Sequence, residues 1–438
     1  MLQLTRYQWT VFAAAWLGWG FDVFDGLLFN YVAPNAIPTL LGLAIGSPEA
    51  KSASLYWTGL LTSIFLLGWA TGGVVFGPIS DRFGRRNTLM VTMLLYALGT
   101  AACAFVTDIW QLIACRIIAS LGIGGEWAAG AAMVAEVVPD RKRVEAGALL
   151  YTAAPFGLFL ATGINALVAG WLFADDPAMS WRFVLLFGLL PAAFAFIVRF
   201  FVKEPERWLE AAAAGATRKP SIAELFGAPL RRRTWSALLM TFVALLTWWS
   251  CNAFIPVVVA TLAQGEAALQ GLDKAATAAL AEEWKTIATT AFNVGGLLGT
   301  LLTIPVAKRL GRRPMFALYF AAAALSLFIT FGLDLPGTVR LYMYFFIGLS
   351  VFGIFGSFTF YLPELFPTRL RGTGSGFCYN IGRVVAAAGP FAVGSVAAAG
   401  AGDPQVIINT LLLVAIVPLV GLAAIPWVVE TRGQALPE

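Results

Sequence analysis

The sequence contains no histidine and few charged residues. Only 12% of its 438 residues are charged, whereas 59% are hydrophobic, which is far from the average composition of soluble domains. Without histidine, any proton relay in this protein must use carboxylates. The four cysteines lie singly in separate apolar stretches and indicate no disulfide framework. No metal-ligand spacing, nucleotide-binding loop or nucleophile triad is present, so we expect no enzyme, no cofactor and no bound metal.

Long apolar stretches make up most of the chain. A membrane-spanning helix needs about 20 predominantly apolar residues, and the sequence predicts twelve such spans. They cover residues 10–31, 55–77, 88–106, 110–135, 146–170, 182–202, 235–262, 286–306, 314–333, 339–362, 373–397 and 406–429. We therefore expect an all-α membrane protein.

Basic residues divide unevenly between the two sides of these spans. With the N-terminus inside, most of the 29 lysines and arginines fall in inner loops, as the positive-inside rule requires. The basic residues outside are Lys51, Arg182, Lys274, Lys285 and Arg340. We expect a multi-pass protein of the cell (inner) membrane with both termini in the cytoplasm. Its net charge of +5 then reflects topology and gives no sign of nucleic-acid binding.

Two short motifs occur twice along the chain. Residues 81–86 (DRFGRR) recur at 308–313 (KRLGRR), and residues 136–141 (EVVPDR) recur at 364–369 (ELFPTR), with nearly the same offset. The repetition predicts a duplicated six-helix unit with the ligand site between the copies. We expect two pseudo-symmetric six-helix bundles, residues 1–202 and 234–438, joined by a cytoplasmic linker at residues 203–233.

Residues 77–86 resemble the signature loop of the major facilitator superfamily, and the resemblance covers nearly the whole chain. It implies that superfamily's twelve-helix fold, with a charge cluster at the inner helix ends that holds the outward-open state. The residues that match this gating cluster and its second copy are Gly77, Asp81, Arg82, Gly84, Arg85, Arg86, Glu136, Arg141, Glu364 and Arg369. In the second copy Lys308 replaces the acid, so we expect that carboxylate contact to be missing there.

Residues 19–25 (WGFDVFD) and 124–130 (GGEWAAG) resemble the sialate and lactate branch of proton symporters. This implies a monomeric, proton-coupled symporter of a small organic anion, a monocarboxylate such as lactate. Residues 363–372 and 430–433 are shared with sugar porters and aromatic-acid symporters, so sugar acids, aromatic acids and a neutral sugar remain alternatives. A receptor without transport activity is a further alternative.

Five ionisable residues interrupt the predicted spans: Asp22, Asp25, Arg116, Glu126 and Arg383. A charge inside the membrane is costly, so each is a candidate for function. Asp22 and Asp25 share one helix face. The resemblance assigns the proton to Asp25 and makes Arg116 its partner; a permanent ion pair between them is the alternative. Glu126 is either a second proton site or a structural hydrogen-bonding group.

Arg383 is the only basic residue deep in a span of the C-terminal half. Tyr379 and Asn380 precede it by four and three residues, so all three share a helix face. Its forked guanidinium suits a substrate carboxylate, and the alternative is a bridge to an acid of the other half. Ligand sites combine aromatic walls with a few polar groups. The further substrate-binding candidates are therefore Trp248, Trp249, Asn252 and Asn293.

Overall fold

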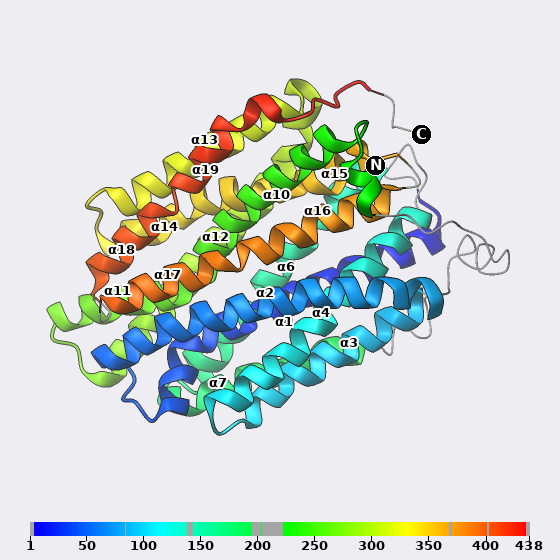
Figure 1. The fold of residues 1–438 in the computed structure, drawn as a ribbon. Coiled ribbons are helices and arrows are strands. Elements are labelled where there is room, and N and C mark those ends of the chain that lie inside the picture. The colour runs from blue at the N-terminus through cyan, green and yellow to red at the C-terminus, as the bar shows by residue number, and fades with distance from the viewer. Residues whose placement is uncertain are drawn as a thin grey trace.

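The computed structural model describes residues 4–83, 85–137, 143–194, 203, 222–367, 370–400 and 403–434. Within these residues twelve helical stretches are long and apolar enough to cross a membrane. They pack side by side in one elongated bundle (Figure 1). The predicted all-α membrane fold is thereby confirmed.

Seven helices and three short helical segments form most of the first six spans. They are α1 (Arg6–Leu41), α2 (Pro48–Phe83), α3 (Arg85–Ala102) with η1 (Cys103–Phe105), α4 (Ile109–Val137), α5 (Arg143–Tyr151) with α6 (Ala153–Leu167) and η3 (Val168–Leu172), and α7 (Pro177–Leu186) with η4 (Phe187–Leu189).

 This half packs chiefly through α4, which contacts α2 and α3, and through α1, which contacts α6 and α4.

 The eighth helix directly follows η4 and covers residues 190–194 of the described chain.

The last six spans contain more breaks. They are formed by α10 (Arg231–Asn252) with α11 (Ile255–Leu269), α12 (Lys274–Leu310), α13 (Arg312–Gly332), α14 (Gly337–Ile347) with η6 (Gly348–Phe352), η7 (Gly353–Ser357) and α15 (Phe358–Leu365), α16 (Arg371–Ala386) with α17 (Ala388–Ala399), and α18 (Pro404–Leu413) with α19 (Ile416–Ala423). Two short helical segments, η5 (Ile222–Phe226) and η9 (Ile425–Trp427), flank this half.

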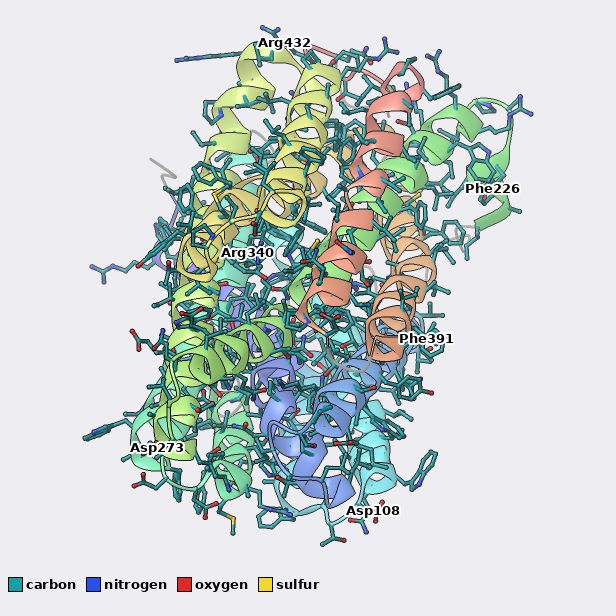
Figure 2. All side chains as sticks on the ribbon, turned by 90° about the vertical axis from the view of Figure 1, so that its left-hand side faces the viewer. Asp108, Phe226, Asp273, Arg340, Phe391 and Arg432 are labelled. Atoms are coloured by element: carbon teal, nitrogen blue, oxygen red, sulfur yellow. The ribbon has the colours of Figure 1, made fainter. Side chains whose placement is uncertain are left out.

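Both chain ends lie at the same end of the bundle (Figure 1), as an even number of spans requires. Arg432 marks this end, and Asp108 and Asp273 mark the opposite one (Figure 2). We call them the terminal end and the distal end. The halves meet along three main contacts, α2 with α17, α6 with α12, and α1 with α11.

Glycines allow the closest helix contacts, and the same device occurs in both halves. A Cβ on Gly124 of α4 would lie 2.0 Å from the carbonyl oxygen of Trp69 in α2. A Cβ on Gly299 of α12 would lie 2.1 Å from the carbonyl oxygen of Leu349 in η6. Only glycine permits such an approach, which is how helices in membranes pack tightly without a hydrophobic driving force.

Two predicted span boundaries were wrong by ten residues or more. The first span extends to Leu41 through Pro34 and Pro38, rather than ending at residue 31. The eighth span begins at Lys274 rather than at residue 286, because Asp273 caps the helix by accepting a hydrogen bond from the backbone N–H of Ala276. The predicted linker, residues 203–233, lies largely outside the described residues, so the domain boundaries stay a prediction.

Candidate functional site

Asp25 lies on α1 and points into the N-terminal half. Its side chain is fully buried, and the hydroxyl of Thr100 in α3 donates to its Oδ2 atom over 2.6 Å. The other oxygen, Oδ1, has no hydrogen-bond partner in the described part of the chain. Asp25 is thus held by one contact and retains one acceptor without a partner.

The predicted partner, Arg116 of α4, bonds elsewhere. Its Nη2 donates to the carbonyl oxygen of Gly26 over 2.8 Å, and its guanidinium lies 4.6 Å from the ring centre of Phe65. No ion pair joins Asp25 and Arg116 among the described side chains, although the two charges interact through space. The structure therefore places them in one charge cluster without the permanent ion pair that was the alternative interpretation.

Asp22 lies one helical turn before Asp25 and faces a second acid, Glu126 of α4. Both side chains are buried, and their carboxyl groups lie close enough to share a hydrogen bond when one of them carries a proton. Glu126 fits against Gly18, where any larger residue would meet its Oε1 atom. Sequence reasoning placed both acids near the site but did not pair them, because α1 and α4 meet only in the folded chain.

Arg383 of α16 crosses from its own half to the other one. Its guanidinium carbon lies 4.1 Å from the ring centre of Trp69 in α2 and 4.7 Å from that of Tyr379. Its Nη1 donates to the Oδ1 atom of Asn380 over 3.1 Å, while its Nε has no hydrogen-bond partner among the described residues. The predicted common face of Tyr379, Asn380 and Arg383 is present, and Asp22 is the acid that interacts with Arg383 through space.

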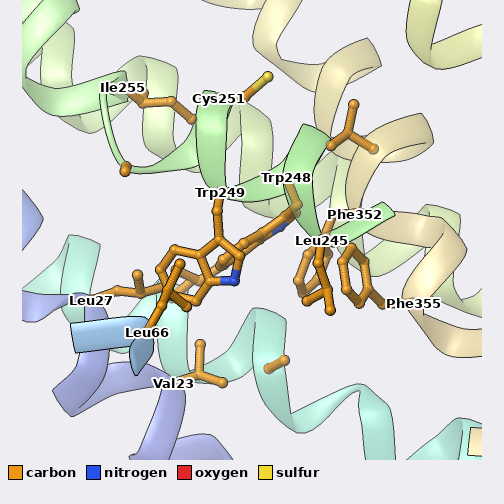
Figure 3. Close-up of a cluster of buried hydrophobic side chains, with 14 of the residues drawn as sticks. Val23, Leu27, Leu66, Leu245, Trp248, Trp249, Cys251, Ile255, Phe352 and Phe355 are labelled. Carbon is orange, nitrogen blue, oxygen red and sulfur yellow. The ribbon is translucent and has the colours of Figure 1, made fainter. Parts of the chain in front are cut away.

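Trp248 and Trp249 of α10 lie in a buried hydrophobic cluster where the two halves meet (Figure 3). The Trp249 ring contacts Trp69 edge-on, with a centroid distance of 6.0 Å. The Trp248 ring packs edge-on against Trp249, with a centroid distance of 4.6 Å, and also lies near Phe352 and Phe355 of the C-terminal half. The two rings thus form an aromatic wall that joins the halves. Trp69 completes this wall and was missed from sequence, because one tryptophan in an apolar span carries no distinguishing signal.

Asn252 and Asn293 line a small cavity between the halves, together with Asn30 and Tyr31 of α1. The side-chain amide of Asn293 also donates to Thr162 of α6 over 3.2 Å. The volume of the cavity that is open to water is about 10 Å³, which is room for about one molecule. The cavity is therefore too small for an organic ligand unless the halves move apart.

The predicted gating residues are described only in part. The side chains of Gly77, Asp81, Arg82, Gly84, Arg85, Glu136, Arg141 and Arg369 lie outside the described residues. Arg86 lies in the first turn of α3 and is partly buried.

Glu364, a residue of the predicted second copy of the gating cluster, lies in a network of hydrogen bonds. It accepts two hydrogen bonds from Arg312, 2.5 Å to Nη2 and 3.1 Å to Nε, and one from the Thr431 hydroxyl over 2.6 Å. Position 308 is a lysine and supplies no carboxylate, as expected. The cluster nevertheless contains a carboxylate, that of Glu364.

Glu430 supplies the second carboxylate of this cluster. It accepts hydrogen bonds from the backbone N–H groups of Arg312 and Arg313 at the start of α13. Burial works to raise the pKa of Glu430, but these N–H groups, with that of Arg432, outweigh burial and hold its pKa below the ordinary value. It is therefore ionised at neutral pH.

Glu282 of α12 forms a buried polar cluster that sequence reasoning missed. Its Oε1 accepts from Lys285 over 2.6 Å and from Asn35 of α1 over 3.2 Å, and its Oε2 accepts from Asn165 of α6 over 3.0 Å. Lys285 had been placed in an outer loop, whereas it lies within α12 and is only 1% exposed. We call these four residues the Glu282 cluster; it joins the two halves near the distal end.

Comparison with known proteins agrees with this fold. The family model of the Major Facilitator Superfamily matches residues 12–390. Similar proteins include the cis,cis-muconate transport protein of Acinetobacter baylyi, 29% identical over 82% of this chain and 84% of that protein. A sialic acid transporter of Escherichia coli is 24% identical over 86% of this chain and 84% of that protein. The crystal structure of a D-xylose–proton symporter covers 98% of both chains with a TM-score of 0.68 at 19% identity. The chain is a multi-pass membrane protein and belongs to the Major Facilitator Superfamily.

Proposed function

We propose that this protein is a proton-coupled symporter that moves a small organic anion across the inner membrane. Buried charges from both halves carry the proposal, because several of their polar atoms have no hydrogen-bond partner among the residues that the structure describes. These atoms include both oxygens of Asp22, the Oδ1 of Asp25 and the Nε of Arg383. An unpaired buried polar atom costs about 1–3 kcal/mol, and more when it is charged. A bound proton and a bound anion would supply the missing partners.

The charge balance of the site suits this pair of ligands. Three carboxylates, Asp22, Asp25 and Glu126, face two guanidiniums, Arg116 and Arg383. One organic anion at Arg383 and protons at the acids bring the embedded charge toward zero. A neutral site is cheaper to enclose between apolar surfaces than a charged one. Binding of both ligands therefore favours the closed state that the protein must pass through.

The names of the relatives guide the choice of substrate. Muconate and sialic acid, named for two of them, are organic acids, and a carboxylate matches the forked donors of Arg383. Lactate remains in the proposed range, beside sugar acids and aromatic acids. A neutral sugar would leave the charge of Arg383 without a counterion. The likeness to the xylose symporter shows a common fold and does not indicate a sugar substrate.

A screen of carboxylates by thermal unfolding tests the proposal. Lactate, cis,cis-muconate, gentisate and sialic acid are added to the purified protein at two pH values, with xylose as the neutral probe. A ligand at 100 times its Kd stabilises by about 2.7 kcal/mol, and a site that takes up a proton with the anion gives the larger shift at the lower pH. Stabilisation by xylose alone would contradict an anion site.

The Glu282 cluster supplies the distal gate in this proposal. In this proposal the terminal end faces the cytoplasm. The two halves are joined by residues 203–233, and the protein works as a monomer. Because Glu282 binds amides from α1 and α6 of the other half, its hydrogen bonds must break before the distal end opens to the outside. The small central cavity and the intact Glu282 cluster both describe a closed state. Substrate reaches the central site only after the two halves separate at one end.

Replacing Asn35 and Asn165 together with alanine is expected to favour the state that is open at the distal end. The change removes both hydrogen bonds between the halves and leaves the Glu282–Lys285 pair intact within α12. Each hydrogen bond to a charged group contributes about 1.5–3 kcal/mol. Spin labels on Trp171 and Leu269, both exposed near the distal end, should show a new population at longer distance.

The matched control is Asn409→Ala, which removes an exposed amide of α18 that bonds only to Gln405 of its own helix. Its distance distribution should equal that of the unmodified protein. An unchanged distribution in the Asn35/Asn165 double variant would show that the Glu282 cluster does not hold the gate.

A further inference from the structure

A concave pocket opens at the terminal end, away from the central site. It lies between the start of α10, the start of α13 and the segment that follows η9. Its volume open to water is about 360 Å³, enough for a headgroup-sized ligand. The residues that line it are Pro229, Arg232, Arg233, Arg313, Val429, Glu430 and Gln434.

Two of its three arginines are held in place by backbone carbonyl groups. Arg233 donates through Nη1 to the carbonyl oxygen of Leu365 over 3.2 Å. Arg313 donates through Nε to the carbonyl oxygen of Val428 over 2.6 Å. Each guanidinium has five N–H donors, so both keep donors for a ligand. The third arginine, Arg232, is exposed at the rim.

The carboxylate in the pocket does not cancel this charge. Glu430 directs its oxygens to the backbone N–H groups of Arg312, Arg313 and Arg432. One carboxylate against three guanidiniums leaves the lining with a net positive charge. The positive-inside rule explains why arginines gather at this end, but it does not explain a hollow with two guanidiniums fixed around it.

Two exposed tryptophans lie close in the sequence to residues that line the pocket. Trp235 follows Arg233 by two residues and is 58% exposed, and Trp427 precedes Val429 by two residues and is 64% exposed. Tryptophan favours the boundary between the bilayer and water. The tryptophans therefore indicate that this end of the bundle lies at the bilayer boundary, where the guanidiniums of the pocket meet the headgroups of anionic phospholipids.

We propose that this pocket binds the phosphate of an anionic phospholipid from the surrounding leaflet, with the acyl chains lying along the exposed apolar surface beside Trp235 and Trp427. Basic pockets between transmembrane helices on the cytoplasmic side bind such headgroups. The proposal rests on the pocket and its charges and does not depend on which solute the protein carries.

Thermal unfolding of the full chain in detergent tests the proposal. Phosphatidylglycerol, phosphatidylcholine and inorganic phosphate are titrated separately. Phosphatidylglycerol should raise the unfolding temperature at lower concentration than phosphatidylcholine. In Arg232→Gln, the concentration of phosphatidylglycerol needed for half the effect should rise about fivefold, the value of one basic residue near an anionic membrane surface. Arg232 is exposed to solvent, so this variant should fold normally.

Arg231→Gln is the matched control, because Arg231 is the adjacent exposed arginine and does not line the pocket. It should bind phosphatidylglycerol like the unmodified protein. An equal loss in both variants would show a general charge effect and overturn the site. Equal responses to the two lipids, or no response to either, would also overturn it. Protection by inorganic phosphate with no added effect of phosphatidylglycerol would assign the pocket to a free anion instead.

Discussion

Replacing Arg383 with alanine is expected to weaken substrate binding roughly 100-fold, because a carboxylate would lose two charge-assisted hydrogen bonds of about 1.5–3 kcal/mol each, offset in part by water. The guanidinium lies over Trp69 of the other half, and within the described ranges its Nε has no hydrogen-bond partner. The affinity is measured by equilibrium binding of the carboxylate that the thermal screen identifies.

Arg383→Lys separates the charge from its geometry. Lysine keeps the positive charge but lacks the planar fork and the flat face that lies over Trp69, so its affinity should fall between those of arginine and alanine. Arg309→Ala removes an exposed arginine at the terminal end and should leave affinity unchanged. Normal affinity in Arg383→Ala would count against Arg383 as the anion site.

Replacing Asp25 with asparagine is expected to abolish proton-driven accumulation while sparing exchange of substrate across the membrane. Asparagine is close in shape and still accepts the hydrogen bond from Thr100, but it cannot gain and lose a proton. The measurement compares uphill uptake with counterflow in vesicles that contain the purified protein. Unaltered uphill uptake would contradict the assignment of the proton to Asp25.

The pair of Asp22 and Glu126 is the rival proton site within the same cavity. If Asp22→Asn loses uphill uptake and Asp25→Asn keeps it, the coupling proton belongs to that pair. The control is Asp175→Asn, which removes an exposed carboxylate from the distal loop after η3 and should change neither process.

Hydropathy alone predicted the twelve spans, since a membrane requires long apolar helices whatever their partners. It misplaced the start of α12, because the residues between Lys274 and Lys285 are too polar for a hydropathy window although they continue the helix. The Glu282 cluster was lost by that error. Its partners Asn35 and Asn165 are single amides in apolar spans, and only the packing of three helices brings them to one carboxylate.

Helix periodicity predicted local features of the site better than long-range ones. The common face of Tyr379, Asn380 and Arg383 follows from their spacing on one helix, and the structure confirms it. The contacts of Arg383 with Trp69, and of Asp25 with Thr100, join separate helices. Sequence spacing contains no information about such contacts, so the site could be located but its pairings could not.

The central claim is that substrate and protons cross the membrane together. The most direct test adds the identified carboxylate outside sealed vesicles that contain the purified protein and a pH-sensitive dye in the lumen. We predict that the lumen becomes acidic as substrate enters, at a rate that depends on substrate and is lost in Asp25→Asn. Uptake of substrate without any change in luminal pH would contradict proton symport.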